Sequence, residues 1–259
     1  MLLTIDVGNT QTVLGAYQGA RLVQMWRMGT DPQATADEVA ARLAGLIAIA
    51  DIDARAIDGV VADTVVPALK HLWKKVARGL FGVEALFVDK DTAPDLLDVT
   101  AYAQTLGTDR IVDAIAARAL YGAPAIVLDL GTATNIEVIG PDGRYKGGAI
   151  APGLQTSMNA LVSGTAQLPA IELVDPGTAI GTDTVQAIQI GVVYGEAARM
   201  DGLVRRIERE LGCAATVVAT GGFCRLIGPL AETVDEVNPE LTLQGLRIVY
   251  EHVHGRGQA

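Results

Sequence analysis

The sequence has few aromatic residues, few cysteines and no excess of positive charge. Of its 259 residues 4% are aromatic, two are cysteines, and the formal net charge at pH 7 is −10. A chain this acidic lacks the basic surface with which nucleic-acid-binding proteins neutralise phosphates, which argues against DNA or RNA as a partner. An anionic small molecule is not excluded, because it needs only a few local donors.

Metal-type cysteine motifs and long apolar runs are also missing. Cys213 and Cys224 show neither CxxC spacing nor clustering, so we expect two free thiols in a cytosolic protein. The N-terminus MLLTIDVGNT has no basic segment and reaches an acid at Asp6, unlike a secretory signal peptide. No apolar run approaches the length of a membrane span. The sequence therefore predicts a cytoplasmic protein.

Alternating apolar residues and turn residues predict a β-β-β-α-β-α-β order in the first third of the chain. Strands are expected over 2–7, 12–17, 21–28, 59–63 and 84–88. Helices are expected over 36–50, with Thr35 or Asp37 as the cap, and from Pro67 to about residue 81. Antiparallel hairpins thus give way to α/β crossovers.

The second half repeats the pattern of the first. A helix within TLGTDRIVDAIAARALYG leads to VLDLGTATNIEVIG and YKGGAIAPG, which match TIDVGNTQTVLG and its following strand in order. Further helices are expected after residue 153, from Asp183 to Leu211 and after residue 222, with strands over 215–221 and 236–239. Two such units indicate an internal duplication, with halves at 1–122 and 123–259.

An acid followed by Gly and Thr at the end of a strand suits phosphate binding. Glycine lets the backbone approach phosphate oxygens, amide and hydroxyl groups donate to them, and the Asp can hold Mg²⁺. An ordinary hairpin turn is the default interpretation of one copy. Two copies, which would grip a nucleotide from both sides, and the adenosine-type VVATGGF favour the nucleotide interpretation. The expected fold is α/β and ribonuclease H-like, a duplicated actin/hexokinase/Hsp70-like fold with mixed central sheets flanked by helices.

Within that group the chain resembles the type III pantothenate kinases. The resemblance rests on DVGNTQTVLG, GTDRIVDAIAA, DLGTATN, GGAIAPGL, GTDTVQAIQIGVVYG, ATGGF and the closing NPELTLQGLRIVYE, in unbroken order. It implies ATP-dependent phosphorylation of pantothenate to 4′-phosphopantothenate, the first step of coenzyme A synthesis. It also implies a homodimer that uses ATP, Mg²⁺ and a monovalent cation, K⁺ or NH₄⁺.

The resemblance also implies roles for individual residues. Asp6 would lie near Mg²⁺, Asp129 would hold the monovalent cation, and Thr132 would bind phosphate. The remaining residues of the first ATP turn would be Val7, Gly8, Asn9, Thr10, Gln11, Thr12 and Val13. Pantothenate would be bound by Gly107, Thr108, Asp109, Arg110 and Thr184, with Asp109 as the catalytic base.

Local sequence leaves a second interpretation of Asp109, because an Asp before an apolar helix is commonly an N-cap. As a base it would orient the hydroxyl and accept its proton, and the helix N-terminus would favour its ionised form. Arg110 would then clamp a carboxylate. We expect Asp113, one helical turn on, to be solvated or to support the site indirectly, with contact to Mg²⁺ as a further alternative.

Three segments depart from the family pattern. Asp63 and Thr64 stand in place of two serines, Asp113 replaces an amide, and Thr100 occupies a tyrosine position in the segment 100–106. Two alternatives therefore stay open: a nucleotide-binding regulator without turnover, and a sugar kinase on the same fold. Retention of Asp109 and Arg110 argues against the regulator. The lack of a zinc-type cysteine cluster argues against the sugar kinase.

Overall fold

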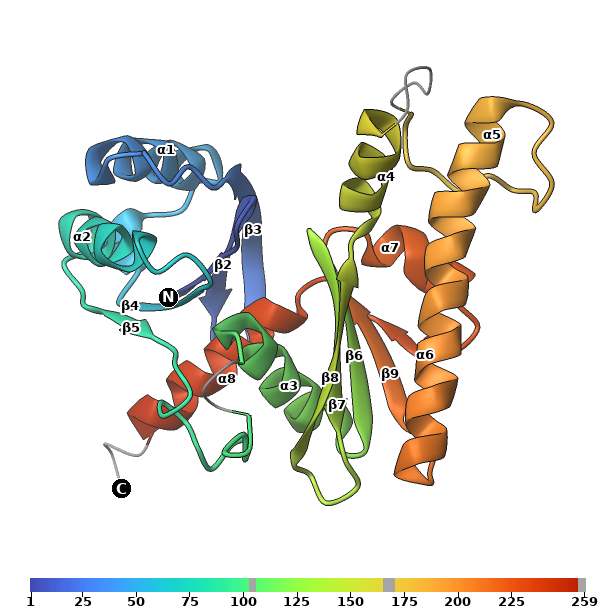
Figure 1. Cartoon of the computed structure of the whole chain (residues 1–259). Coiled ribbons are helices and arrows are strands. Elements are labelled where there is room, and N and C mark those ends of the chain that lie inside the picture. Colours follow the sequence, from blue (N-terminus) through green and yellow to red (C-terminus); the bar gives the residue numbers. More distant parts are fainter. Residues whose placement is uncertain (103–105, 165–170, 256–259) are drawn as a thin grey trace. The chain divides into compact units, whose positions relative to one another are not determined.

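The computed structural model describes residues 1–102, 106–164 and 171–255, and it divides into two compact units (Figure 1). The first unit comprises Met1–Ala116 and Thr242–Ala259, and the second comprises Ala117–Leu241. The C-terminal segment therefore belongs with the first unit, whereas the division expected from the sequence counts it in the second half. Each unit has its own sheet and its own hydrophobic core.

The sheet of the first unit has the strand order β3-β2-β1-β4-β5. Its strands are β1 (Leu2–Val7), β2 (Gln11–Gln18), β3 (Arg21–Gly29), β4 (Gly59–Thr64) and β5 (Ala85–Phe87). β1 runs antiparallel to β2, and β4 runs parallel to both β1 and β5. Helices precede and follow β4, because parallel neighbours need crossover connections. The predicted order of strands and helices is confirmed.

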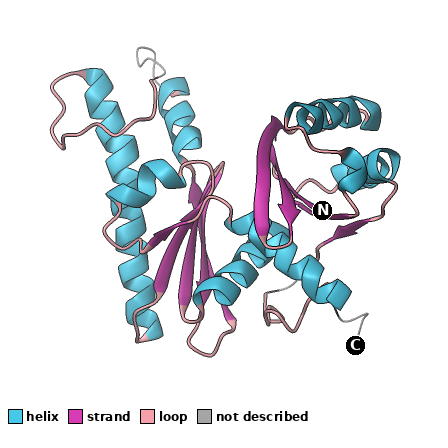
Figure 2. Cartoon of the chain, turned by 180° about the vertical axis from the view of Figure 1, so that it is seen from behind, coloured by secondary structure: helices cyan, strands magenta, loops and turns pink. Residues whose placement is uncertain are grey.

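Two helices, α1 (Ala36–Ile49) and α2 (Leu69–Phe81), share one core with β1 and β4 (Figure 2). α1 begins at the predicted cap Thr35, whose hydroxyl accepts from the Glu38 amide while the Glu38 carboxylate accepts from the Thr35 amide. The prediction that α2 begins at Pro67 is wrong by two residues. The amides of Leu69 and Lys70 each bond three residues back, so a tight turn precedes the helix.

The other face of the first sheet is covered by α8 (Leu241–Gly255), which is not among the predicted elements. A Cβ on Gly15 of β2 would lie 2.9 Å from the side chain of Leu243. Likewise, a Cβ on Gly245 would lie 2.4 Å from the Val112 carbonyl oxygen on α3 (Thr108–Tyr121). Glycines at these contacts therefore let α8 lie against both the sheet and the start of α3.

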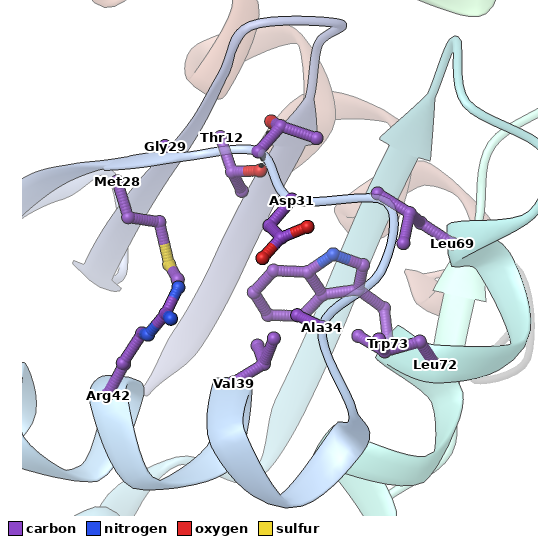
Figure 3. Close-up of a pocket in the computed structure, with 11 residues that line it drawn as sticks. Thr12, Met28, Gly29, Asp31, Ala34, Val39, Arg42, Leu69, Leu72 and Trp73 are labelled. Atoms are coloured by element: carbon purple, nitrogen blue, oxygen red, sulfur yellow. Dashed lines mark hydrogen bonds between the residues drawn. The ribbon is translucent and has the colours of Figure 1, made fainter.

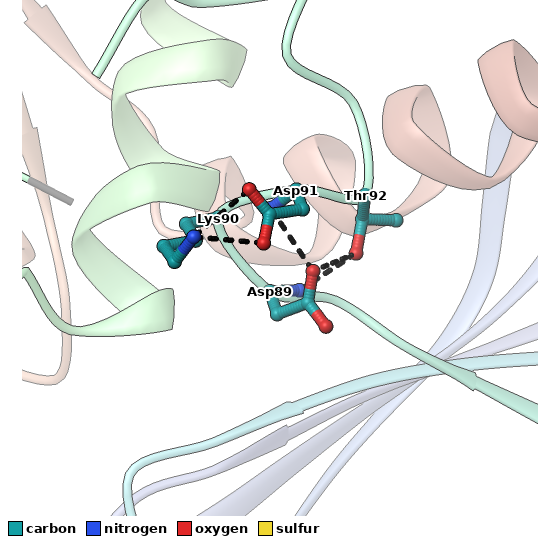
Figure 4. Close-up of polar contacts among 4 residues, drawn as sticks. All are labelled: Asp89, Lys90, Asp91 and Thr92. Atoms are coloured by element: carbon teal, nitrogen blue, oxygen red, sulfur yellow. Dashed lines mark hydrogen bonds and ion pairs between the residues drawn. The ribbon is translucent and has the colours of Figure 1, made fainter. Parts of the chain in front are cut away.

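The segment between β5 and α3 is held by side-chain-capped turns. The Asp89 carboxylate accepts from the Asp91 amide and the Thr92 hydroxyl (Figure 4). Asp98 accepts from the amide and hydroxyl of Thr100 in the same way. Such turns fix a chain that lacks regular structure. Residues 103–105, in the segment that departs from the family pattern, lie outside the described residues.

The sheet of the second unit has the order β10-β9-β6-β7-β8 and repeats the first. Its strands are β6 (Ala125–Leu130), β7 (Ala133–Ile139), β8 (Tyr145–Pro152), β9 (Thr216–Thr220) and β10 (Glu236–Val237). β6 is antiparallel to β7 and parallel to β9, just as β1 is antiparallel to β2 and parallel to β4. The duplication expected from the two turns is present in the topology.

The helices of the second unit include a long segment with an irregular middle. The predicted helix over 183–211 consists of α5 (Thr184–Gln189), a π-helical turn (Ile190–Tyr194) and α6 (Gly195–Leu211). The remaining helices are α4 (Leu154–Ser163) and α7 (Cys224–Ile227). None of the helices in the described ranges combines the length and apolar character needed to cross a bilayer.

Candidate active site

The turn between β1 and β2 is closed by backbone hydrogen bonds. The Gly8 amide donates to the Gln11 carbonyl at 3.1 Å, and the Thr30 amide donates to the Thr10 carbonyl at 3.0 Å. Asn9, Thr10 and Gln11 are exposed. The turn is therefore a braced hairpin with exposed polar side chains, which is compatible with both the hairpin and the phosphate-loop interpretations.

A pocket lies beside this turn, between the ends of β2 and β3 and the two helices α1 and α2 (Figure 3). Thr12, Asp31 and Arg42 contribute polar groups, and Trp73 contributes a wall. On this face of the sheet, Leu3, Ile5 and Val7 of β1 pack into the core shared with α1 and α2. Asp6 alternates with them and points to the opposite face of the sheet. The pocket is therefore separate from the acids described next.

Asp6 lies beside a second acid. Asp6 on β1 and Asp63 on β4 are register partners in the parallel pair, so their side chains project from the same face. The strand ends are tied together, because the Val65 amide donates to the Val7 carbonyl at 3.2 Å. Asp63 is fully buried, while Asp6 is partly buried.

The start of α3 is anchored to the same strand ends. The Thr108 hydroxyl donates to the Thr64 carbonyl at 3.2 Å, which places Asp109 and Asp113 near Asp63. α3 begins at Thr108, so Asp109 lies within its first turn and is not the N-cap. The Asp109 carboxylate accepts from the amide of Arg110 at 2.8 Å. Unit 1 therefore gathers four acids from β1, β4 and α3.

The environment of this cluster differs from the expectation in two respects. Asp113 is only 2% exposed, so the solvated alternative is wrong, while indirect support of the site stays a prediction; the face of α3 that carries Asp113 is covered in the folded unit. Burial raises the pKa of Asp109, and Arg110 partly opposes this shift. Loss of hydration is thus the largest contribution to the pKa of Asp109, and it outweighs the lowering effects of Arg110 and of the backbone amides at the helix start.

Gly107 makes room for the Asp109 carboxylate. A Cβ at Gly107 would lie 2.4 Å from Asp109 Oδ1, closer than atoms that are not bonded can approach. The Gly-Thr-Asp-Arg segment therefore needs glycine at its first position for the acid to adopt this rotamer. The sequence motif includes Gly107, but only the structure shows that the Asp109 carboxylate occupies the space of its missing side chain.

In the second unit, the turn between β6 and β7 is held by the segment that follows β8. The Gly131 amide donates to the Ala133 carbonyl at 3.0 Å. The Thr132 carbonyl accepts from the Gly153 amide at 3.2 Å and from the Thr156 hydroxyl at 2.7 Å. A Cβ on Gly153 would lie 2.3 Å from the Gly131 carbonyl oxygen. The GGAIAPG segment therefore supports this turn directly.

The ATGGF segment also contacts this turn. Gly221 has a φ of +87°, and a Cβ there would lie 2.4 Å from Asp129 Oδ1. The Phe223 amide donates to the Leu130 carbonyl at 3.0 Å. Asp129 is paired in register with Asn135 and Thr220, both neutral. The described structure therefore joins three separate motifs around Asp129.

Two predicted residues of the second unit are exposed. Thr132 lies at the tip of the β6–β7 turn, and Thr184 is the first residue of α5. The Asp183 side chain caps α5 by accepting from the Gln186 amide at 2.9 Å. Sequence reasoning missed Asp63 as a member of the acid cluster. Its position at the end of a strand, like that of Asp6, was the available signal.

The fold agrees with that of a nucleotide-bound protein. The activator of 2-hydroxyisocaproyl-CoA dehydratase from Clostridium difficile, solved with bound ADPNP, superposes with a TM-score of 0.60 over 100% of this chain and 97% of that chain, at 13% identity. The duplicated sheets and the paired turns define an α/β protein of the actin/hexokinase/Hsp70 fold group. Phosphoryl transfer needs a group that orients the attacking hydroxyl beside the phosphates, so acids gathered next to a phosphate-type turn are compatible with a phosphotransferase.

The sequence comparisons identify the family. The profile of the type III pantothenate kinases matches residues 2–206, and the chain belongs to this family. The type III pantothenate kinase of Parafrankia sp. (strain EAN1pec) is 45% identical over 252 residues, which cover 97% of this chain and 98% of the relative. That of Streptomyces coelicolor is 44% identical over 259 residues, with 97% and 98% covered. The pantothenate kinase function implied by the resemblance is confirmed, and neither alternative is favoured.

Proposed function

We propose that Asp109 is the base and Asp6 the Mg²⁺ ligand when the γ-phosphoryl group of ATP passes to the primary alcohol of pantothenate. The observation that carries this proposal is the gathering of Asp6 and Asp109 around Asp63, although they come from distant parts of the sequence. Phosphoryl transfer depends mainly on positioning and on compensation of charge. An acid beside the phosphate turn meets the first need, and the metal site meets the second.

The first turn supplies the phosphate contacts. Its glycine, Gly8, leaves the backbone open to close approach, and its exposed side chains from Asn9 to Gln11 add donors. Val7, Thr12 and Val13 complete the segment that holds ATP. Mg²⁺ bound at Asp6 would neutralise charge on the phosphate oxygens. Support comes from Asp63 beside Asp6, because its two buried carboxylate oxygens have no hydrogen-bond partner among the described residues and could accept a cation.

The start of α3 supplies the acceptor contacts. Asp109 orients the hydroxyl of pantothenate and takes its proton, while the Arg110 guanidinium pairs with the pantothenate carboxylate. Gly107 and Thr108 form the adjacent wall, since Thr108 fixes the helix start to β4. Thr184 adds a further contact. The raised pKa of Asp109 suits a base that must capture a proton from an alcohol.

The second turn holds phosphate through Thr132 and a monovalent cation, K⁺ or NH₄⁺, through Asp129. Support comes from the two register partners of Asp129, because Asn135 and Thr220 bring oxygen and amide groups without further charge. A carboxylate flanked on both neighbouring strands by neutral residues suits a singly charged ion. Asn135 Nδ2 lies 3.5 Å from Asp129 Oδ2. At this distance the hydrogen bond between the amide and the carboxylate is weak at most.

The active form is a cytoplasmic homodimer. Support comes from large exposed apolar side chains of the second unit, among them Ile150, Leu161, Val174, Ile180 and Val185. A dimer interface that covers part of them would remove apolar surface from water. Light scattering after size exclusion would give the mass of the particle, and a monomer at micromolar concentration would contradict the dimer.

The experiment that tests the reaction is an ADP-release assay with purified protein and a panel of acceptors. Pantothenate should support turnover, whereas glucose, N-acetylglucosamine and no acceptor should not. Each arm is run with K⁺ and with Na⁺. Turnover without an acceptor would indicate a phosphatase or ATPase, and turnover only with a sugar would indicate a sugar kinase.

A further inference from the structure

Asp63 is a buried acid whose environment on balance disfavours its charge, since only its own backbone amide opposes the effects of burial and of the neighbouring acids. Its exposed fraction is 0%, and within the described chain neither carboxylate oxygen has a hydrogen-bond partner. Burying an ionised carboxylate without a partner costs several kcal/mol of free energy. This is about the cost of removing one member of a buried ion pair, which leaves the other charge unpaired. A native protein that keeps such a group therefore supplies either a proton or a cation.

The charged groups that act on Asp63 within the described residues are all acids. They are Asp6 on the neighbouring strand and Asp109 and Asp113 on α3. Arg110 acts on Asp109, but it is not among the groups that act on Asp63. Burial and these three acids together raise the pKa of Asp63 well above its ordinary value. The side chain thus points into a region of negative potential.

We infer that Asp63 is a second carboxylate ligand, beside Asp6, for the divalent cation that accompanies the nucleotide. The inference rests on the proposed role of Asp6. The two acids are register partners on adjacent parallel strands, so their carboxylates project side by side from one face. A divalent ion between them cancels both charges and supplies the partner that the Asp63 oxygens lack.

The size of the ligand set favours Mg²⁺ over an ion that the protein encloses completely. Among the described residues no group of three or more His, Cys, Asp or Glu is arranged to hold a metal ion. Mg²⁺ is usually bound by one or two carboxylates together with waters and substrate phosphates. Two carboxylates at the base of a phosphate turn match that pattern, with the nucleotide and water supplying the other ligands.

A second carboxylate changes how the protein acquires the metal. Asp6 alone would bind Mg²⁺ weakly, so the ion would arrive with ATP. With Asp63 beside it, the protein should bind the divalent ion before the nucleotide, because two charges attract it in a region of low dielectric constant. Binding of metal to the folded state alone should also raise the melting temperature in the absence of ATP.

The test uses Mn²⁺ as the probe for Mg²⁺ and measures free Mn²⁺ by electron paramagnetic resonance, without nucleotide. The parent protein should bind one Mn²⁺, and Asp63→Asn should weaken this binding by about tenfold or more, as loss of a metal-site residue commonly does. Asp113→Asn is the matched control, because it removes a buried acid of the same cluster that the inference does not make a ligand. Its effect should be much smaller.

The melting temperature provides a second readout. In EDTA, Asp63→Asn should melt above the parent, since the substitution removes an uncompensated buried charge. In Mg²⁺ the parent should gain more than the variant. If Asp63→Asn does not fold by circular dichroism, Asp63→Ser serves in its place, and the Mg²⁺ shift of the parent is measured in any case.

Three results would overturn the inference: equal Mn²⁺ affinity in parent and Asp63→Asn, equal weakening by Asp63→Asn and Asp113→Asn, or no Mg²⁺-dependent shift in the parent. Failure of the proposed function is distinguishable, because it shows in the acceptor panel. A protein that binds Mn²⁺ through Asp63 but does not phosphorylate pantothenate would retain the metal site and lose only the proposed reaction.

Discussion

The two halves of the chain share one topology but surround their equivalent acids differently. Asp6 in the first sheet corresponds to Asp129 in the second, since each faces an antiparallel hairpin on one side and a parallel strand on the other. The parallel neighbour is Asp63 in the first half and Thr220 in the second. The scaffold thus repeats, while the neighbouring parallel strand contributes an acid in the first half and a neutral residue in the second.

The difference extends to the backbone after that neighbouring strand. In the first half the next residue is Thr64, whose hydroxyl donates to the Val66 carbonyl at 3.1 Å. In the second half it is Gly221, whose missing side chain leaves space for Asp129. In the first half, α3 therefore adds further acids near the turn, whereas in the second half the backbone of Gly221 lies against Asp129. This difference is compatible with a divalent ion and a base in the first half and a singly charged ion in the second.

The largest expected effect comes from removing Asp109, the proposed base, which belongs to the first half. Asp109→Asn keeps the shape of the side chain but cannot accept the proton, so kcat should fall by about 10³-fold. ATP binding should persist, because the phosphate turn is unchanged. The ADP-release assay and calorimetric titration with an ATP analogue measure the two quantities separately.

Asp37→Asn is the matched control for Asp109→Asn. Asp37 also lies in the first turn of a helix of the first unit, but it is exposed. Its replacement should leave kcat unchanged. Wild-type-like turnover of Asp109→Asn would show that Asp109 is not the base. The difference in acids between the two halves would then not explain the chemistry.

The second largest effect concerns the second half. Gly221→Ala places a Cβ against Asp129 Oδ1 and the Leu130 backbone at a φ of +87°, where L side chains are strained. We expect a loss of about 3 kcal/mol or more in the free energy of unfolding, from strain and steric overlap together. Urea denaturation measures it.

Gly222→Ala is the control for this substitution. Gly222 is exposed and has no atom within 4 Å of its would-be Cβ, so its replacement should change stability by no more than about 0.5 kcal/mol. Equal effects of Gly221→Ala and Gly222→Ala would show that the contact between ATGGF and the second turn is unimportant.

A smaller effect should appear in the response to monovalent cations. If Asp129 holds K⁺ or NH₄⁺, Asp129→Ala should lose the difference in rate between K⁺ and Na⁺, because the substitution removes the charged ligand. Activity measured against K⁺ concentration tests this. If the variant responds to K⁺ as the parent does, the cation binds elsewhere. The two halves would then not hold different cations as proposed.

Local signals predicted much of this structure. The strands around each turn, the cap at Thr35 and the motif glycines follow from residues close in sequence. Contacts distant in sequence were less accessible. The closing helix α8 joins the first unit through Gly15 and Gly245, and no local signal specifies that partner.

The candidate site shows the same limit. The resemblance to the family singled out Asp6 and Asp109, but Asp63 enters the cluster through the register of β4 against β1. Asp113 is buried because its face of α3 is covered, which the i,i+4 spacing from Asp109 does not reveal. Register and helix docking decide both facts, and both depend on residues far away in the chain.

The smallest expected effect concerns the first helix after each hairpin. The N-cap of α1, Thr35, forms reciprocal bonds with Glu38, whereas the N-cap of α4 is Gly153, which offers no side-chain cap. Hydrogen bonds from Thr35 lower the pKa of Glu38 below its ordinary value of 4.5. A lowered pKa in the folded state means that the ionised form stabilises the fold, so this stabilisation is present above that ordinary value and is lost as pH falls through the lowered pKa.

Glu38→Gln should therefore lower the melting temperature slightly at neutral pH, and the difference from the parent should shrink as the solution is acidified past the ordinary pKa. Thermal melts across this pH range measure it, with Glu210→Gln, an exposed glutamate on α6 of the second unit, as the control. A difference that is constant with pH would mean that the charge of Glu38 does not contribute. The cap of the first half would then be no stronger than the uncapped start of α4.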